Sequence, residues 1–332
     1  MKVTRVCVLL CCHFVICTAE WFTAAGIALA GIFVAKPLYC RLKECCKERW
    51  IPRNITRLDV QLNEQVFGQH IAVEVVYKAI KGHVLDPNPS KALVLSLHGW
   101  TGCGKNHIST IIADSLYKLG GNSKYVHKII PTKDFPNANK LSYYKDILLK
   151  KIIESVKKCS KTMFIFDEVD KAPQGLLNIL KPFLDHHQKI DDVDYRKCIF
   201  IFLSNTGGNH INNFVINHWK QGKKRENLDV KDMESILNKA VYNIDGGLWH
   251  SDLISHNVID FFVPILPLER RHVKECIKVD LLRKNRNPSE DIVNKIADRL
   301  QYGSDMMFST TGCKRVSTRV DEILYDRKQL AL

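Results

Sequence analysis

A glycine-rich stretch from Gly99 to Asn106 has the residue types and the spacing of a phosphate-binding loop. It reads GWTGCGKN and matches the pattern G-x-x-x-x-G-K-[ST], except that Asn106 replaces the final Ser or Thr. An apolar run of strand length precedes the loop and a helical pattern follows it, which is the context that this motif requires. Glycines let backbone N–H groups approach phosphate oxygens, and a lysine adds positive charge beside them. The residues expected to bind ATP are therefore Gly99, Trp100, Thr101, Gly102, Cys103, Gly104, Lys105 and Asn106.

Two acids, Asp167 and Glu168, follow a second apolar run, MFIF at 163–166. A carboxylate at the tip of a buried strand is costly unless it has a metal or a donor as partner. We expect Asp167 to hold Mg²⁺, directly or through water, and Glu168 to orient or deprotonate the attacking water. The amide oxygen of Asn106 is a neutral hard ligand that can replace a hydroxyl near Mg²⁺. The loop with Asn106 therefore predicts slower or more conditional hydrolysis of ATP. The alternative role for Asp167 and Glu168 is to cap a helix.

A third apolar run, CIFIFLS at 198–204, ends at Asn205, whose amide can hold the attacking water or the γ-phosphate. The alternative is a turn residue before two glycines. Further along, Lys314 stands near the start of a helical pattern and is expected to reach the phosphates. Its neighbour Cys313 is predicted to form a disulfide with Cys276, tying two helices together beside the nucleotide. The expected catalytic residues are Lys105, Glu168 and Asn205, and the expected Mg²⁺ ligands are Asn106 and Asp167.

The elements around these motifs alternate between strand-like and helix-like patterns. Apolar runs that alternate with amphipathic helices indicate an α/β fold, a parallel sheet covered by helices on both faces. Ligands of such sheets bind at the carboxyl ends of the strands, where all three motifs fall. After residue 269 every pattern is helical. We therefore predict a large nucleotide-binding α/β domain at 58–268 and a small helical domain at 269–332.

The N-terminus has the layout of a secretory signal peptide at 1–19, with cleavage after Ala19. A second apolar segment at 20–36 is short for a spanning helix and is predicted to associate with a membrane surface. An uncleaved anchor formed by both stretches is the alternative. A basic, cysteine-rich linker is expected at 37–57, and Asn54 begins a glycosylation sequon, Asn-Ile-Thr.

The composition is that of a globular protein, with 45% hydrophobic and 25% charged residues in a chain of 332. The formal net charge is +14, but the basic residues are scattered and no nucleic-acid-binding motif is visible. No nucleic-acid partner is expected, while an anionic membrane surface is a plausible one. Some of the 12 cysteines should pair in an oxidising lumen, whereas Cys198 lies in an apolar run and is expected to be a buried thiol.

Several segments together resemble the torsin family of AAA+ ATPases, which is related to the Clp/HSP100 proteins. They are GWTGCGKN, FIFDE, IFLSN, FVPILPLE and GCK, together with NSKYVHKIIPTKDFPN and LKPFLDHH. The resemblance implies that Asn106 is a family trait and that Asn205 occupies a sensor position. It also implies an ATPase of the endoplasmic reticulum lumen and nuclear envelope that remodels proteins or membranes. A ring or filament of identical chains is expected, and no aromatic–glycine loop for threading polypeptide is visible.

The stretch that should supply an arginine finger contains no arginine, since none occurs between Arg225 and Arg270. Such a finger is worth about 10³–10⁵ in rate, so the chain alone should hydrolyse ATP poorly. The resemblance implies a membrane-anchored activator of the lamina-associated-polypeptide type, whose luminal domain brings the arginine. Two rival functions stay open: a nucleotide-gated binding scaffold, and a DNA-associated P-loop ATPase suggested by the positive charge.

Overall fold

A computed structural model gives the fold of residues 39–243, 253, 257–303 and 307–325. The chain divides into two compact units, Met1–Trp50 and Ile51–Leu332. In the described part of the first unit, a disulfide joins Cys40 and Cys45, and the Trp50 indole donates a hydrogen bond to the Cys40 carbonyl at 2.7 Å. The predicted signal peptide (1–19) and hydrophobic segment (20–36) lie outside the described residues.

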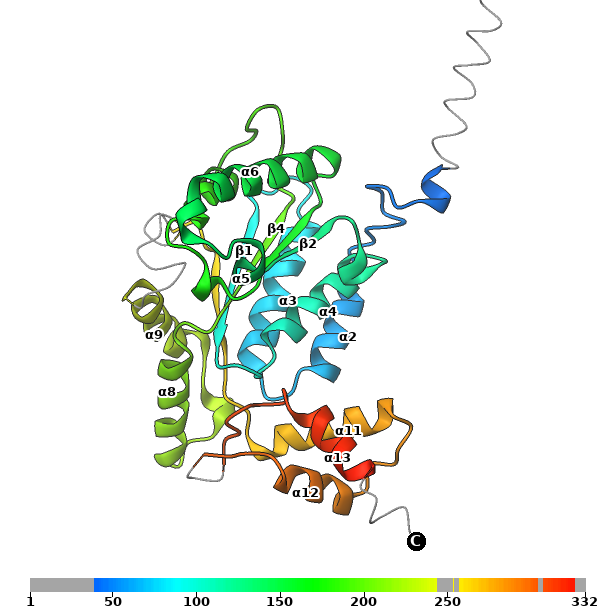
Figure 1. The fold of residues 1–332 in the computed structure, drawn as a ribbon, viewed down its shortest axis with the longest axis vertical. Helices are drawn as coiled ribbons and strands as arrows, with labels where there is room; N and C mark the ends of the chain where they lie inside the picture. Colours follow the sequence, from blue (N-terminus) through cyan, green and yellow to red (C-terminus); the bar gives the residue numbers. More distant parts are fainter. Residues whose placement is uncertain (1–38, 244–252, 254–256, 304–306, 326–332) are drawn as a thin grey trace, which may run out of the picture. The chain divides into compact units, whose positions relative to one another are not determined.

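The second unit is built on a parallel sheet of five strands, ordered β2-β3-β4-β1-β5 (Figure 1). The two central strands β1 and β4 are buried along their whole length, because helices cover both faces of the sheet. The predicted parallel α/β fold is thus confirmed. The strands are β1 (Leu93–Gly99), β2 (Val126–Ile129), β3 (Met163–Phe166), β4 (Ile199–Ser204) and β5 (Phe261–Ile265).

Helices flank the sheet on both sides. In Figure 1, α2, α3 and α4 lie together on one side, while α8 and α9 lie on the other. The short helix α7 follows a 3-10 turn (Leu177–Leu180), and Pro182, which lacks a backbone N–H, lies in its first turn. The helices are α2 (Ile55–Gln65), α3 (His70–Leu85), α4 (Lys105–Leu116), α5 (Pro131–Asp134), α6 (Leu141–Lys158), α7 (Lys181–Leu184), α8 (Gly208–Lys220) and α9 (Val230–Asn243).

Helix α2 begins inside the stretch that was predicted to be a linker. Asn54 is its N-cap, and the side-chain oxygen accepts a hydrogen bond from the backbone N–H of Arg57 at 2.8 Å. The preceding Ile51 is only 1% exposed. Residues 51–57 therefore belong to the folded unit.

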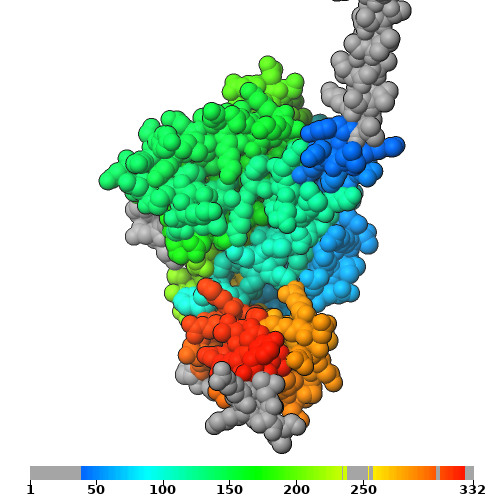
Figure 2. Space-filling model, turned by 45° about the vertical axis from the view of Figure 1, so that its right-hand side comes forward, coloured from blue at the N-terminus to red at the C-terminus, as the bar shows by residue number. Residues whose placement is uncertain are grey.

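The C-terminal region is helical, as predicted, and forms a lid on the large domain. It consists of α11 (Arg270–Arg283), α12 (Glu290–Asp298) and α13 (Val316–Leu324). Figure 2 shows this orange-to-red lid seated directly against the cyan and green large domain. Within the described part of the chain, no helix has the length and apolar character needed to cross a membrane.

Candidate functional site

The glycine-rich loop connects the end of β1 to the start of α4. Gly102 has φ of 80° and Gly104 has φ of 116°, conformations that a residue with a side chain rarely adopts. These two turns bring the chain directly into the first turn of α4, whose N–H groups have no partner inside the helix. The loop therefore presents backbone donors for an anion at a helix N-terminus.

Lys105 is folded back onto the loop and buried, with 8% of its surface exposed. Its ammonium donates hydrogen bonds to the carbonyls of Gly99 at 2.6 Å and Trp100 at 2.9 Å, and to Asn205 Oδ1 at 3.0 Å. Burial lowers the pKa of Lys105 from its ordinary value. The structure thus joins two of the predicted catalytic residues, Lys105 and Asn205, across the ends of β1 and β4.

Asp167 lies just beyond β3 and is buried, with 9% of its surface exposed. Its Oδ2 atom accepts a hydrogen bond from Asn106 Nδ2 at 2.7 Å and forms an ion pair with Lys128 Nζ at 2.9 Å. The two predicted Mg²⁺ ligands are therefore in direct contact. Lys128 was not predicted, because an exposed lysine on an edge strand carries no sequence signal.

The neighbouring Glu168 adopts φ of 57°, a left-handed conformation that costs roughly 1 kcal/mol or more outside glycine. Its carboxylate accepts hydrogen bonds from Lys171 Nζ at 3.0 Å and from Thr132 Oγ1 at 3.2 Å. The bond to Glu168 raises the pKa of Lys171. The carboxylate of Glu168 thus contacts both α5 and the 3-10 turn Val169–Lys171 that follows β3.

Asn205 is held at the end of β4 by a second acid. Its backbone N–H donates to Asp170 Oδ1 at 3.0 Å, and its side-chain amide lies 3.3 Å from Asp170 Oδ2. With its Oδ1 accepting from Lys105, the orientation of this amide is fixed from both ends. An ordinary turn residue would need neither contact.

The buried His98 braces the segment that follows Asn205. Its Nδ1 lies 3.0 Å from the Thr206 carbonyl and its Nε2 lies 2.7 Å from Ser96 Oγ. Because a carbonyl only accepts, Nδ1 carries the proton and Nε2 accepts from the hydroxyl. Burial lowers the pKa of His98 to about 4, which agrees with a neutral ring. His98 was not predicted, since a lone histidine in an apolar run has no distinguishing pattern.

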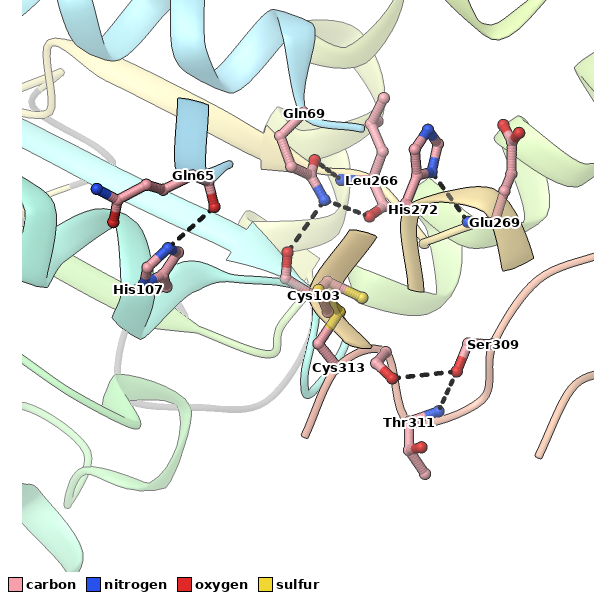
Figure 3. The surroundings of a disulfide bond; sticks show 12 residues. Gln65, Gln69, Cys103, His107, Leu266, Glu269, His272, Ser309, Thr311 and Cys313 are labelled. Carbon is pink, nitrogen blue, oxygen red and sulfur yellow. Dashed lines mark hydrogen bonds between the residues drawn. A yellow bond between two sulfur atoms is a disulfide. The ribbon is translucent and has the colours of Figure 1, made fainter. Parts of the chain in front are cut away.

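The buried Gln69, at the start of α3, ties the loop to β5. Its Nε2 donates to the carbonyls of Cys103 at 3.0 Å and Leu266 at 2.8 Å, and its Oε1 accepts from the Leu266 N–H at 2.8 Å (Figure 3). These contacts join segments that are 197 residues apart in the sequence. Only the folded structure shows this role for Gln69.

Hydrogen bonds to backbone carbonyls join the lid to the glycine-rich loop. Cys313 N–H donates to the Gly102 carbonyl at 3.0 Å, and the Trp100 indole donates to the Thr310 carbonyl at 3.0 Å. In the structure Cys313 is disulfide-bonded to Cys276, so the lid loop is joined covalently to α11. Figure 3 shows Cys103 of the loop beside this disulfide.

A cavity of about 550 Å³ lies between the lid and the large domain. Its lining combines the polar residues of the predicted site with apolar side chains, among them Val66, Phe67, Val279 and Val316. A mixed polar and apolar lining in a cavity of this size suits a nucleotide. Of the predicted site residues, the cavity is lined by Thr101, Gly102, Cys103, Gly104, Lys105, Asn106, Asp167, Glu168, Asn205, Cys276, Cys313 and Lys314. Gly99 and Trp100 do not line it, but their carbonyls accept hydrogen bonds from Lys105.

Two side chains of the cavity also fit Mg²⁺. Within the described residues, no donor contacts Oδ1 of Asp167 or Oδ1 of Asn106. These are a carboxylate and an amide oxygen, the hard ligands that Mg²⁺ prefers. Because Asn106 turns its N–H₂ toward Asp167, its oxygen points elsewhere.

Outside the cavity, two further predictions can be placed. Asn54 is exposed, and its Nδ2 takes no part in capping α2. Among the described cysteines, Cys103 and Cys198 are free and buried, so the prediction of a buried thiol at Cys198 is confirmed. Within the described ranges, no group of three or more histidine, cysteine, aspartate or glutamate residues is placed to hold a metal ion.

The fold resembles solved structures of Hsp104. One is an S. cerevisiae Hsp104–ADP complex, with a TM-score of 0.59 and 18% identity over 91% of this chain. Another is Hsp104 in a closed state with ATPγS and FITC-casein, with a TM-score of 0.54. At 18% identity the likeness shows the fold alone, that of an AAA+ domain with a helical lid. The chain spans about half the length of each, 51% and 47%.

Family comparisons match both domains. The model described as Torsin matches residues 40–166, and that of the Torsin-1A C-terminal domain matches residues 268–322. A torsin-like protein of Caenorhabditis elegans is 43% identical over 86% of this chain and 81% of its own length. A torsin-like protein of Drosophila melanogaster is 38% identical over 91% of each chain. With two family models and two long relatives in agreement, the chain belongs to the torsin family.

Proposed function

We propose that this chain binds ATP with Mg²⁺ and hydrolyses it when a partner completes the site. One observation carries the proposal: the ends of β1, β3 and β4 bring Lys105, Asp167, Glu168 and Asn205 to one cavity, which Lys314 closes from the lid. A chance glycine turn would not place acids and an amide from two other strands around a buried lysine.

Each side chain has a distinct role in this proposal. Lys105 exchanges its carbonyl partners for the β- and γ-phosphate oxygens, and the N–H groups of the loop bind the same phosphates. Asp167 and Asn106 hold Mg²⁺, which neutralises charge on the phosphates when bound. Glu168 accepts a proton from the attacking water, and Asn205 orients that water. Lys314 contributes a second positive charge from the lid.

The missing arginine supports an external activator. Arg225, the last arginine before the lid, has only 4% of its side chain exposed and donates to the Pro267 carbonyl at 2.7 Å. It therefore supports the interior and is not available to a neighbouring molecule. Since no arginine follows until Arg270, we propose that a lamina-associated-polypeptide-type luminal domain supplies one.

We further propose a location in the lumen of the endoplasmic reticulum and nuclear envelope, on the membrane surface. Disulfides persist in oxidising compartments, and the described chain contains Cys40–Cys45 and Cys276–Cys313. The exposed Asn54 sequon is open to glycosylation there. Self-assembly into a ring or filament and the remodelling of proteins or membranes complete this proposal.

The test is ATP turnover by the purified chain with and without the luminal domain of a candidate activator. We expect little phosphate release alone and a stimulation of at least about a hundredfold with the activator, because the arginine is worth about 10³–10⁵. Glu168→Gln should abolish the stimulated release and trap a stable complex with ATP and activator. Equal turnover with and without activator would contradict the role of the missing arginine.

The same variant separates the enzyme from the nucleotide-gated scaffold. An enzyme loses its cellular function when Glu168→Gln blocks turnover, whereas a scaffold keeps it, because binding persists. A chain that fails to bind ATP with Lys105 intact would refute both functions. Protease protection in sealed microsomes, with endoglycosidase sensitivity at Asn54, would exclude the DNA-associated rival.

A further inference from the structure

Lys128 contacts the carboxylate that is proposed to hold Mg²⁺. It lies on the edge strand β2, one residue before the strand ends, and pairs in register with Ile165 of β3. From there its Nζ reaches Asp167 Oδ2 at 2.9 Å. Within the described residues, Asp167 forms no other ion pair.

The exposure of the two partners differs. The side chain of Asp167 is 13% exposed, while that of Lys128 is 46% exposed. Asp167 is held in place by its backbone N–H, which donates to the Ile129 carbonyl at 2.8 Å. The lysine can therefore swing into solvent, whereas the carboxylate cannot leave.

Two donors share one oxygen of this carboxylate. Asn106 Nδ2 at 2.7 Å and Lys128 Nζ at 2.9 Å both approach Oδ2. The amide is neutral, but the ammonium carries the charge that a metal ion would otherwise supply to Asp167. A cation already paired with the carboxylate reduces its attraction for Mg²⁺ and repels the incoming ion.

We propose that Lys128 is a positioning residue that sets the Mg²⁺ requirement of the site. In the nucleotide-free protein it holds Asp167 and neutralises the carboxylate, and Mg²⁺ with nucleotide displaces it into solvent. Binding of the metal must overcome this ion pair, so a higher Mg²⁺ concentration is required than with an uncharged residue at 128. The inference rests on the proposed ATP site and adds to it a residue that controls occupancy by the metal.

The test is binding of a fluorescent ATP analogue to the full chain as MgCl₂ is titrated into chelator-treated protein. Lys128→Met removes the charge and keeps the length of the side chain. We expect the Mg²⁺ concentration at half-maximal tight binding to fall by about threefold to tenfold, because the competing charge is gone. Lys128→Arg keeps the cation and should stay within about twofold of the parent chain.

Lys145→Met is the matched control, because it makes the same change in net charge on α6, outside the lining of the cavity. Its Mg²⁺ requirement should equal that of the parent. Circular dichroism checks that each variant is folded, and substituting the half-exposed Lys128 should leave the fold intact. An unchanged or increased Mg²⁺ requirement in Lys128→Met would overturn the inference. Absence of analogue binding by the parent at every Mg²⁺ concentration would instead refute the proposed ATP site.

Discussion

Single side chains at the strand ends fix one another before any nucleotide binds. Asn205 is held between Lys105 and Asp170, and His98 is held between Ser96 and Thr206. All of these contacts are hydrogen bonds of ordinary length in a largely buried setting. The residue positions required for chemistry are therefore set mainly by polar contacts behind the cavity.

The buried ring of His98 makes stability depend on pH. Its pKa of about 4 lies below the ordinary value of 6.5, so between these values the unfolded chain binds a proton that the folded chain excludes. The free energy of unfolding should therefore fall as pH decreases from about 6.5 to 4, by up to about 1.4 kcal/mol per pH unit for this ring. Urea unfolding at several pH values measures the slope.

Other histidines with lowered pKa values contribute to the same slope, so a variant is needed to isolate the contribution of His98. Burial also lowers the pKa of His83 to about 4 and that of His272 to about 3. His98→Gln removes one titration and retains a donor and an acceptor. For this variant, the slope of the free energy of unfolding against pH should be smaller by the amount that corresponds to about one bound proton. An identical slope in the variant and the parent would show that His98 titrates normally.

The motif residues of the site could be predicted from sequence, but their supports could not. Lys105, Asp167 and Asn205 each follow a distinctive local pattern, a glycine-rich loop or a long apolar run. Gln69 and Lys128 act through contacts with segments far away in the chain. Residues of these types occur on any surface or helix start, so only three-dimensional proximity identifies them.

At the scale of elements, the lid loop and the glycine-rich loop are packed so closely that neither tolerates a methyl group. A Cβ at Gly312 would collide with the carbonyl oxygen of Gly102, and a Cβ at Gly102 would collide with that of Thr311. Both glycines also have positive φ, 54° and 80°. The contact between lid and loop therefore depends on glycine at both positions.

Gly312→Ala should weaken nucleotide binding by about tenfold and lower stability by about 1–3 kcal/mol, because of the strained φ and the clash. The control is Gly82→Ala in α3, where an added Cβ meets nothing within 4 Å. That change should raise stability by about 0.5–1 kcal/mol, since glycine is unfavourable inside a helix. Fluorescent-nucleotide titration and thermal unfolding measure both effects. Unaltered affinity in Gly312→Ala would separate the lid contact from nucleotide binding.

Among the elements, the sheet strands with long apolar runs were predictable, and β5 was less so. Its sequence FFVPI contains Pro264, which cannot donate in a ladder and argues against a central strand. The structure places β5 at the edge of the sheet beside β1, where proline is tolerated. The start of helix α2 was missed for a different reason, since its first residues fall in the basic, cysteine-rich stretch that was predicted to be a linker.

At the scale of the whole folded unit, a buried ion pair joins the large domain to the lid. Arg225 and Glu269, the N-cap of α11, have only 4% and 5% of their side chains exposed and lie 3.7 Å apart. Arg225 also donates to the carbonyls of Gly68 and Pro267. One guanidinium thus contacts three segments where the two domains meet.

Arg225→Met should destabilise the protein by about 3 kcal/mol or more, because it leaves a buried carboxylate and two carbonyls with fewer donors. Glu269 keeps its ion pair with Arg271 at 2.6 Å, which limits the loss. Arg299→Met is the control, since this exposed arginine lies 3.6 Å from Glu322 and should cost less than about 1 kcal/mol. Denaturant unfolding compares the two, and similar values would show that Arg225 contributes no more than a surface pair.

The covalent bond between Cys276 and Cys313 has a practical consequence for the production of the protein. A bridge across 37 residues removes about 3–4 kcal/mol of chain entropy from the unfolded lid. Synthesis in an ordinary bacterial cytosol keeps thiols reduced, so recombinant material made there would carry a loosened C-terminal region beside the cavity. Such a preparation would underestimate ligand affinity, and secretion into the periplasm or an oxidising host strain should restore it.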